Sequence, residues 1–227
     1  MELGGLPVET DVSRGVWISS ARRRGGRGTV ASLVPDVFDA YARVLHPAVR
    51  YAGDDDVDVR WAEVAAHNRT VADRLAHWET LTGGRVDSQP PVWDDGPSEG
   101  HLPVGVARRL ATVLARHTTT PAECLFGRWD GFGYDLPDAD VPPRLLLRGE
   151  RDVVLVRGAV GDAVRNLAPE PHEQSANLWW PDDQAWCVVT DVDLRGSYVG
   201  GSAACIAELL DTAGLEALPV APEDPIA

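Results

Sequence analysis

The sequence predicts an α+β protein in which N-terminal helices pack on a mostly antiparallel sheet of about five strands, closed by a C-terminal helix. Two observations predict this class. Up to His117 the apolar residues recur mainly at helical spacing, whereas after it short apolar runs of strand length alternate with turns. Helices and strands therefore stand in separate runs, which is typical of α+β folds rather than of alternating βαβ units.

The chain divides by composition into two segments. Residues 1–28 have many glycines and little periodicity, so we expect an arginine-rich, partly ordered arm, followed by a single α+β domain over residues 29–227. The arm ends in an arginine cluster, and the sequence leaves open whether this cluster folds onto the body, keeps the chain soluble or binds phosphate. The cluster consists of Arg22, Arg23, Arg24 and Arg27.

Helices are predicted in the first half of the chain, each from an apolar stripe with plausible ends. They lie between Pro35 and Pro47, at about 61–67, between Thr70 as N-cap and Gly83 as stop, and over 103–117. The intervening residues 84–100 are rich in turn formers and predict an excursion over the surface.

Strands are predicted from five apolar runs in the second half: CLFGRW, RLLLR, DVVLVRG, NLWW and AWCVVTDVD. Runs that are apolar on both faces, such as 153–156, indicate central strands covered by helices. The Pro-Asp-Asp turn after Trp180 predicts that the chain reverses before Trp186. Ser202 is then expected to cap the closing helix.

Charge restricts the partners that the protein can have. The net charge is −14, and because residues 1–28 carry five arginines and three acids, the rest of the chain carries −16. Such a body repels nucleic-acid phosphates and anionic lipid and attracts basic proteins. All 21 basic residues are arginine, which excludes a Walker-type phosphate loop and Schiff-base chemistry on lysine. We therefore expect a basic protein partner, no nucleic acid, no membrane and no cofactor.

Cysteine usage and the N-terminal sequence indicate an intracellular protein. The three cysteines are widely spaced, lie among apolar residues and form no Cys-x-x-Cys pair, so they are expected to be reduced core thiols. Neither an apolar signal segment nor a run of membrane-spanning length is present. A cytoplasmic location is expected.

A binding surface is predicted where aromatic and acidic residues gather in the sheet half. Trp179 and Trp180 are adjacent in a strand and must face opposite ways, so one of them is expected on a less buried face. There an indole offers a large contact area and a hydrogen-bond donor to a partner. Together with Trp129, Asp182 and Asp183, these residues form the predicted surface.

A second interpretation assigns catalysis to the carboxylates at a strand end. Asp191 and Asp193 project to the same face, which suits a divalent cation, and Asp130 could join them. They would serve a small metal-dependent hydrolase or transferase. Sequence motifs add no support, because the histidines show no metal-binding spacing and no serine lies in a Gly-x-Ser-x-Gly turn.

An EF-hand loop is excluded although its first positions match. Asp54, Asp56 and Asp58 occupy the first, third and fifth positions. Val59 and Ala65, however, replace the glycine needed for the turn and the glutamate needed for bidentate coordination. A solvated acidic loop is expected instead.

Four stretches together resemble an uncharacterised family of soluble proteins from GC-rich bacterial genomes: LVPDVFDAYARVLHPA, TTTPAECLFGRWDGFG, WWPDDQAWCVVTDVD and YVGGSAACIAELL. The resemblance spans roughly Thr29 to Val220 and carries over no catalytic residue. More distantly, an opening helix followed by a sheet and a closing helix is similar to the SUKH superfamily of immunity and interaction domains. This chain departs from that superfamily at His46-Pro47 and in the inserted helices between Trp61 and His117.

Two functions therefore remain. The sequence favours a non-enzymatic acidic interaction module, immunity-type by the SUKH resemblance, that binds a basic partner through the aromatic and carboxylate surface. The alternative is the metal-dependent enzyme using Asp191 and Asp193. The two differ in whether these carboxylates converge with a histidine in a concave pocket or lie on an open surface.

Overall fold

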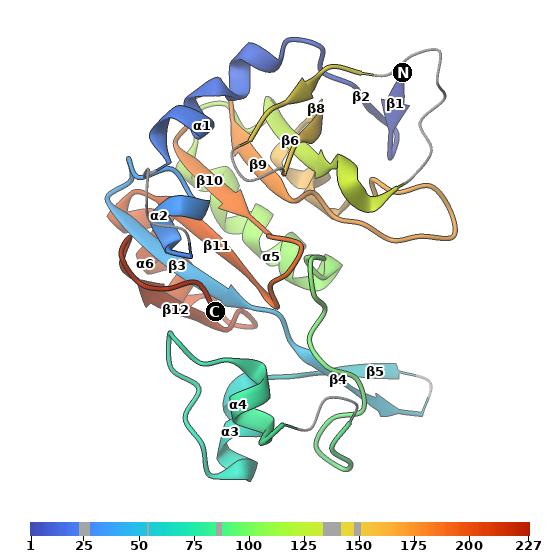
Figure 1. The fold of residues 1–227 in the computed structure, drawn as a ribbon, viewed down its shortest axis with the longest axis vertical. Helices are drawn as coiled ribbons and strands as arrows, with labels where there is room; N and C mark the ends of the chain where they lie inside the picture. The colour runs from blue at the N-terminus through green and yellow to red at the C-terminus, as the bar shows by residue number, and fades with distance from the viewer. Residues whose placement is uncertain (23–27, 54, 85–87, 134–141, 148–150) are drawn as a thin grey trace.

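An antiparallel sheet of eight strands, rather than the five expected, forms the centre of this α+β protein (Figure 1). The computed structural model describes residues 1–22, 28–53, 55–84, 88–133, 142–147 and 151–227. Across the sheet the strand order is β12 (Ala217–Val220), β3 (Ala40–Leu45), β11 (Gly196–Gly201), β10 (Trp186–Val189), β9 (Leu178–Pro181), β6 (Cys124–Trp129), β8 (Val153–Gly158) and β7 (Arg144–Leu145). All five strands predicted from apolar runs are present.

The helix predicted between Pro35 and Pro47 is wrong, because residues 40–45 form strand β3. This strand pairs with β11 on one side and β12 on the other. Its apolar side chains enter both layers of the core: Tyr41 lies on one face of the sheet, and Ala42 and Val44 lie on the other. A strand buried on both faces shows a nearly continuous apolar run, and here that run also fits a helical stripe.

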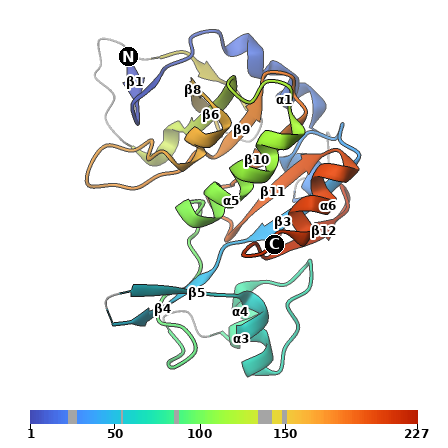
Figure 2. The same cartoon turned by 180° about the vertical axis from the view of Figure 1, so that it is seen from behind.

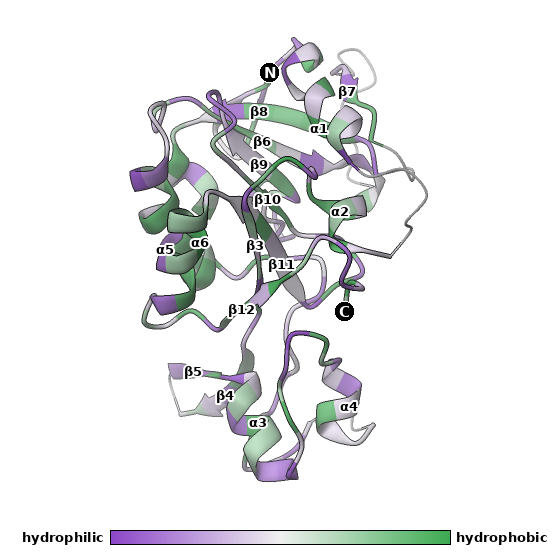
Figure 3. Cartoon of the chain, turned by 90° about the vertical axis from the view of Figure 1, so that its left-hand side faces the viewer, coloured by the Kyte–Doolittle hydropathy of each residue, from purple (hydrophilic) through white to green (hydrophobic). Residues whose placement is uncertain are grey.

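Helices cover both faces of the sheet, as Figures 2 and 3 show. One face carries α5 (Val104–Leu114) and α6 (Ala203–Asp211), and the other carries α1 (Val16–Ala21) and α2 (Val30–Leu33). The predicted cap of α6 is confirmed, since the Ser202 hydroxyl accepts a hydrogen bond from the Cys205 amide at 3.2 Å. In the described part of the chain, no helix is long and apolar enough to cross a membrane.

The predicted reversal between Trp180 and Trp186 is confirmed. Strands β9 and β10 pair antiparallel, with Val188 opposite Trp179. The alternation also holds, because Trp186 and Val188 enter the core under α5 and α6 whereas Cys187 enters the core under α1 and α2.

Residues 1–22 pack against the body. Strands β1 (Glu2–Leu3) and β2 (Leu6–Pro7) form a small hairpin, and a 3₁₀ turn at Val12–Gly15 leads into α1. Leu6 is 5% exposed and Ile18 is fully buried, so the segment contributes to both layers of the core. Of the arginine cluster, Arg23, Arg24 and Arg27 lie outside the described residues.

A small lobe stands at one end of the sheet, formed by β4 (Ala48–Ala52), β5 (Asp55–Val59), α3 (Trp61–Asn68) and α4 (Trp78–Thr82) (Figure 1). The helix expected at 61–67 is confirmed. The following helix begins only at Trp78 instead of after Thr70, although Gly83 ends it in a left-handed conformation as expected.

Three tryptophans form the core of the lobe. The Trp78 ring lies between those of Trp61 and Trp93, with centroid separations of 5.2 and 5.3 Å. Trp93 is fully buried, so the segment 84–100, expected only as a surface excursion, supplies part of this core. The lobe therefore folds around aromatic packing rather than around an extended helical stripe.

The expectation of core thiols is confirmed. Cys124, Cys187 and Cys205 are all free and buried. Burial raises the pKa of Cys187 and of Cys205 to about 12, and it also raises the pKa of Cys124. Since the thiolate is the reactive form, these cysteines are inert in the folded protein.

Candidate functional site

The tryptophan pair belongs to the core and forms no surface. Trp179 and Trp180 face opposite ways as predicted, yet each is only 1% exposed, so the expectation of a less buried face is wrong. Trp179 packs against Phe126 and Trp186. Trp180 packs edge to face against Trp17 of α1, which covers the second face of the sheet.

Asp182 and Asp183 are engaged within the chain. Asp182 forms an ion pair of 2.5 Å with Arg14, while Asp183 accepts hydrogen bonds from the Thr119 amide at 2.7 Å and the Thr118 hydroxyl at 2.8 Å. Partial burial opposes ionisation of Asp183, but the hydrogen bonds from the two threonines outweigh it and lower its pKa. Both carboxylates thus tie the β9–β10 turn to neighbouring loops.

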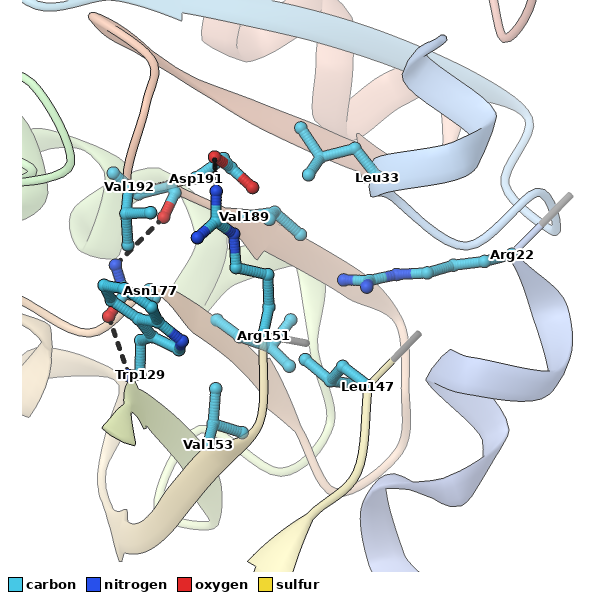
Figure 4. A pocket seen from close by; sticks show the side chains of 12 residues that line it. Arg22, Leu33, Trp129, Leu147, Arg151, Val153, Asn177, Val189, Asp191 and Val192 are labelled. Atoms are coloured by element: carbon cyan, nitrogen blue, oxygen red, sulfur yellow. Dashed lines mark hydrogen bonds and ion pairs between the residues drawn. The ribbon is translucent and has the colours of Figure 1, made fainter. Parts of the chain in front are cut away.

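The remaining predicted residues meet around an arginine that the sequence does not single out. The Arg151 guanidinium lies over the Trp129 ring, 5.0 Å from its centroid. The same guanidinium pairs with the Asp193 carboxylate. It also lies 3.7 Å from the carboxylate of Asp191 (Figure 4). Asp130 pairs instead with Arg144 at 2.6 Å. Trp129, Asp191 and Asp193 are therefore neighbours.

The alternative metal site lacks further ligands. Within the residues that the structure describes, no group of three His, Cys, Asp or Glu side chains is placed to hold a metal ion. A guanidinium already faces both Asp191 and Asp193 at the position that a cation would take. The acidic loop expected around Asp56 and Asp58 is wrong, because both residues, although exposed, lie on strand β5; Asp54 is outside the described residues.

A small pocket lined in part by Arg151, which we call the Arg22 pocket, has an internal volume of about 30 Å³ and opens to solvent. The Arg22 side chain follows the last residue of α1 and extends toward Val189 and Leu147 (Figure 4). Most of the lining is apolar. The complete lining is Arg22, Leu33, Trp129, Leu147, Arg151, Val153, Asn177, Leu178, Val189, Thr190, Asp191 and Val192.

The guanidinium of Arg22 has no acceptor within the part of the chain that the structure describes. The residue is 8% exposed, and its Nε is buried without a hydrogen-bond partner. Burial lowers its pKa, which the charge of Asp191 partly offsets. The neighbouring amide of Asn177 is satisfied, because it donates to the Thr190 carbonyl and accepts from the Trp129 amide. Arg22 is thus an available donor inside a largely apolar cavity.

A second hollow, which we call the junction groove, lies between the lobe and the main sheet and measures about 550 Å³. Its one arginine, Arg195, is neutralised by Glu99 at 3.1 Å and Glu79 at 3.7 Å. Exposed carboxylates without an ion pair in the described chain remain: Asp58, Asp95 and Glu173. The groove is therefore negatively charged.

Histidine His101 lines the same groove. Burial lowers its pKa, and the charge of Glu173 opposes that change. Its Nδ1 accepts a hydrogen bond from the Ser175 amide at 3.0 Å. The ring is consequently neutral at pH 7 and adds no positive charge to the groove.

A serine–histidine contact occurs at the base of the lobe but is buried. His46 Nδ1 donates to the Ser98 carbonyl at 2.8 Å, and its Nε2 accepts from the Ser197 hydroxyl at 3.0 Å. The Ser197 oxygen lies 2.6 Å from that of Thr190. His46 and Ser197 are both fully buried, so a substrate does not reach the hydroxyl, and the chain of hydrogen bonds is structural.

Comparison with known proteins gives no relative: no family model matches this chain, and neither does any curated protein or solved structure.

Proposed function

We propose that this chain is a non-enzymatic interaction module that binds a basic segment of a protein partner in the junction groove. The observation that carries the proposal is a set of three carboxylates that form no ion pair in the described part of the chain, Asp58, Asp95 and Glu173, around a hollow of about 550 Å³. A partner's arginine or lysine side chains would supply the missing charges. The net charge of −14 favours the same partner at long range.

The groove replaces the surface expected from the sequence. Trp179 and Trp180 are buried, and Asp182 and Asp183 already bind groups of the same chain. An immunity-type role, in which binding blocks the partner's own activity, stays a prediction. The opening helix on which the SUKH resemblance depended is strand β3, so the role rests on charge complementarity alone.

The enzyme alternative has less support. It requires Asp191 and Asp193 to hold a cation, whereas Arg151 faces both carboxylates. The three cysteines and Ser197, which could serve as nucleophiles, are buried.

A defined basic peptide tests the proposal. We expect acetyl-Arg-Gly-Arg-Gly-Arg-amide to bind the protein in calorimetric titrations, with an affinity that falls as salt rises. The triple variant Asp58→Asn, Asp95→Asn, Glu173→Gln should bind about tenfold more weakly, because each exposed ion pair contributes roughly 0.2–1 kcal/mol.

The matched control removes three exposed acids elsewhere: Glu2→Gln, Asp39→Asn and Asp211→Asn. Its net charge equals that of the groove variant, so it reports the effect of bulk charge alone. If the control weakens binding as much as the groove variant does, or if the wild-type protein does not bind the peptide, the groove is not the binding site.

A further inference from the structure

The buried arginines of this protein differ in what they donate to. Arg43 and Arg128, at 0% and 2% exposure, each donate to a backbone carbonyl at 2.8 Å, those of Ala76 and Leu167 respectively. Arg22 is buried nearly as deeply and reaches no acceptor in the described chain. Burying a charged group without a hydrogen-bonding partner is costly. An acceptor supplied from outside the chain would remove that cost.

The size of the Arg22 pocket limits what this acceptor can be. A cavity holds one water molecule for each ~10–15 Å³, so about 30 Å³ has room for two or three small atoms beside the guanidinium. A planar carboxylate group is of this size, whereas a tetrahedral phosphate with its oxygens is larger. The fork of an arginine also matches the two oxygens of a carboxylate.

The surroundings of the pocket favour a ligand with one negative charge and an apolar body. Asp191 lines the pocket, and Asp193 lies beside it on the same arginine, so a dianion would be repelled. Leu33, Leu147 and Val189 supply hydrocarbon walls. Since Arg151 already faces the two aspartates, Arg22 is the group left to pair with the ligand.

We propose that the Arg22 pocket binds the carboxylate of a small apolar monocarboxylate, which Arg22 holds through two parallel hydrogen bonds from Nε and a terminal nitrogen. The apolar part of the ligand lies outside these 30 Å³, in the wider space of about 340 Å³ that opens to solvent, along Leu33 of α2 and Val189 of β10. This site is separate from the junction groove and does not depend on it. It shares no lining residue with the groove.

The test uses isovalerate as the probe and isovaleramide and inorganic phosphate as comparisons. Binding is followed by calorimetry and by methyl NMR shifts of Leu33, Leu147 and Val189. We expect isovalerate to bind saturably, one to one, with shifts at these methyl groups. The uncharged amide should not bind, and phosphate should bind more weakly than isovalerate.

Substitution of Arg22 separates the proposed site from unspecific binding. Arg22→Met should weaken isovalerate binding by about tenfold or more, the range expected for loss of charge-assisted hydrogen bonds. Arg22→Lys keeps the charge without the fork and should bind with intermediate affinity. Arg108→Met, which removes an exposed arginine from α5, is the matched control and should bind like the wild type.

Several outcomes would overturn the proposal. Isovalerate does not bind the wild-type protein saturably, phosphate binds more tightly than isovalerate, or the methyl shifts fall outside the pocket. Equal binding by Arg22→Met would overturn it as well. If Arg22→Met does not fold, the wild-type titration and the Arg22→Lys variant decide, since the latter keeps a cation at the end of α1.

Discussion

Buried arginines in two regions of the molecule, Arg43 and Arg22, show when such a cation is structural. At the junction between β3 and the lobe, Arg43 is fully buried, lies 5.2 Å from the centre of the Trp61 ring and donates to the carbonyls of Ala76 and Arg74. At the end of α1, Arg22 meets hydrocarbon walls instead. A loop packed against Arg43 presents backbone carbonyls to one of its terminal nitrogens, although its Nε and its other terminal nitrogen are buried without a partner. Arg22 donates to no group in the described part of the chain, so its whole guanidinium is left to a ligand.

Arg22 is buried only if α1 is part of the folded body. Truncation of the chain before Thr29 tests this and has the largest predicted effect. A chain that starts at Thr29 loses Leu6 and Ile18 from the two core layers. We expect the free energy of unfolding to fall by more than about 5 kcal/mol, since removing a large core side chain costs roughly 2–5 kcal/mol. Urea denaturation measures it.

Single substitutions on α1 provide the control for that truncation. Ile18→Ala should cost about 2–5 kcal/mol, whereas Val16→Ala, at a position 51% exposed on the same helix, should cost less than about 0.5 kcal/mol. A truncated chain as stable as the full one would mean that residues 1–28 are the dispensable arm that composition suggests.

The two arginines should respond differently to the same substitution. Arg43→Met leaves the carbonyls of Arg74 and Ala76 without their donor, and we expect a loss of about 4 kcal/mol. Arg22→Met removes a buried charge that has no acceptor in the described chain, so its effect should lie within about 1 kcal/mol or stabilise the protein. Equal losses in the two variants would contradict the distinction.

His46, in the same junction, predicts how stability changes with pH. Burial, the main cause, lowers its pKa from 6.5 to about 4, so the fold favours the neutral ring. Its contribution is complete above pH 6.5 and is lost as the pH falls toward 4, in total about 3 kcal/mol at 1.36 kcal/mol per pKa unit. The difference in unfolding free energy between wild type and His46→Gln should shrink by this amount over that window. A constant difference would mean that folding does not lower the pKa of His46.

The sequence predicts elements that depend on local pattern. Strands β6, β8 and β10 are dense apolar runs of strand length, and α5 has a clear apolar stripe, so the sequence predicts each of them. It does not predict strand β3, because the partners that make these residues a strand, β11 and β12, lie more than 150 residues away. Strand β11 ends in glycines that look like a bend. The packed Phe38 ring explains one of them, since a Cβ on Gly200 would lie 2.4 Å from it.

The candidate sites were predictable only in part, for a similar reason. Because side chains alternate along a strand, the sequence predicts that Trp179 and Trp180 lie on opposite faces of the sheet. It does not predict that Trp180 is covered, because the helix that covers it, α1, belongs to the segment expected to be an arm. The sequence Arg22-Arg23-Arg24 does not indicate that Arg22 is buried, because its burial depends on the residue at which α1 ends. The junction groove joins Asp58, Asp95 and Glu173 from three distant segments, and no spacing connects them.

The smallest predicted effect concerns the carboxylates beside the Arg22 pocket. The double variant Asp191→Asn, Asp193→Asn breaks the pairs with Arg151, whose side chain is 32% exposed, while that of Asp193 is 72% exposed. Pairs this open contribute roughly 0–1 kcal/mol, so the unfolding free energy should change by no more than about 1 kcal/mol. Removing two negative charges next to Arg22 should also tighten isovalerate binding.

The same variant decides between binding and metal-dependent catalysis at this site. If the protein is an interaction module, calorimetric titration with magnesium, manganese, calcium or zinc should show no stoichiometric binding that is lost in the double variant. The arginine beside them makes this the expected result, because a divalent cation would have to displace the Arg151 guanidinium and find further oxygen ligands. Stoichiometric binding by the wild-type protein that disappears in the double variant would replace the module with the enzyme. Arg22 would then lie beside a metal centre, and its lack of an acceptor would no longer indicate a site for a carboxylate ligand.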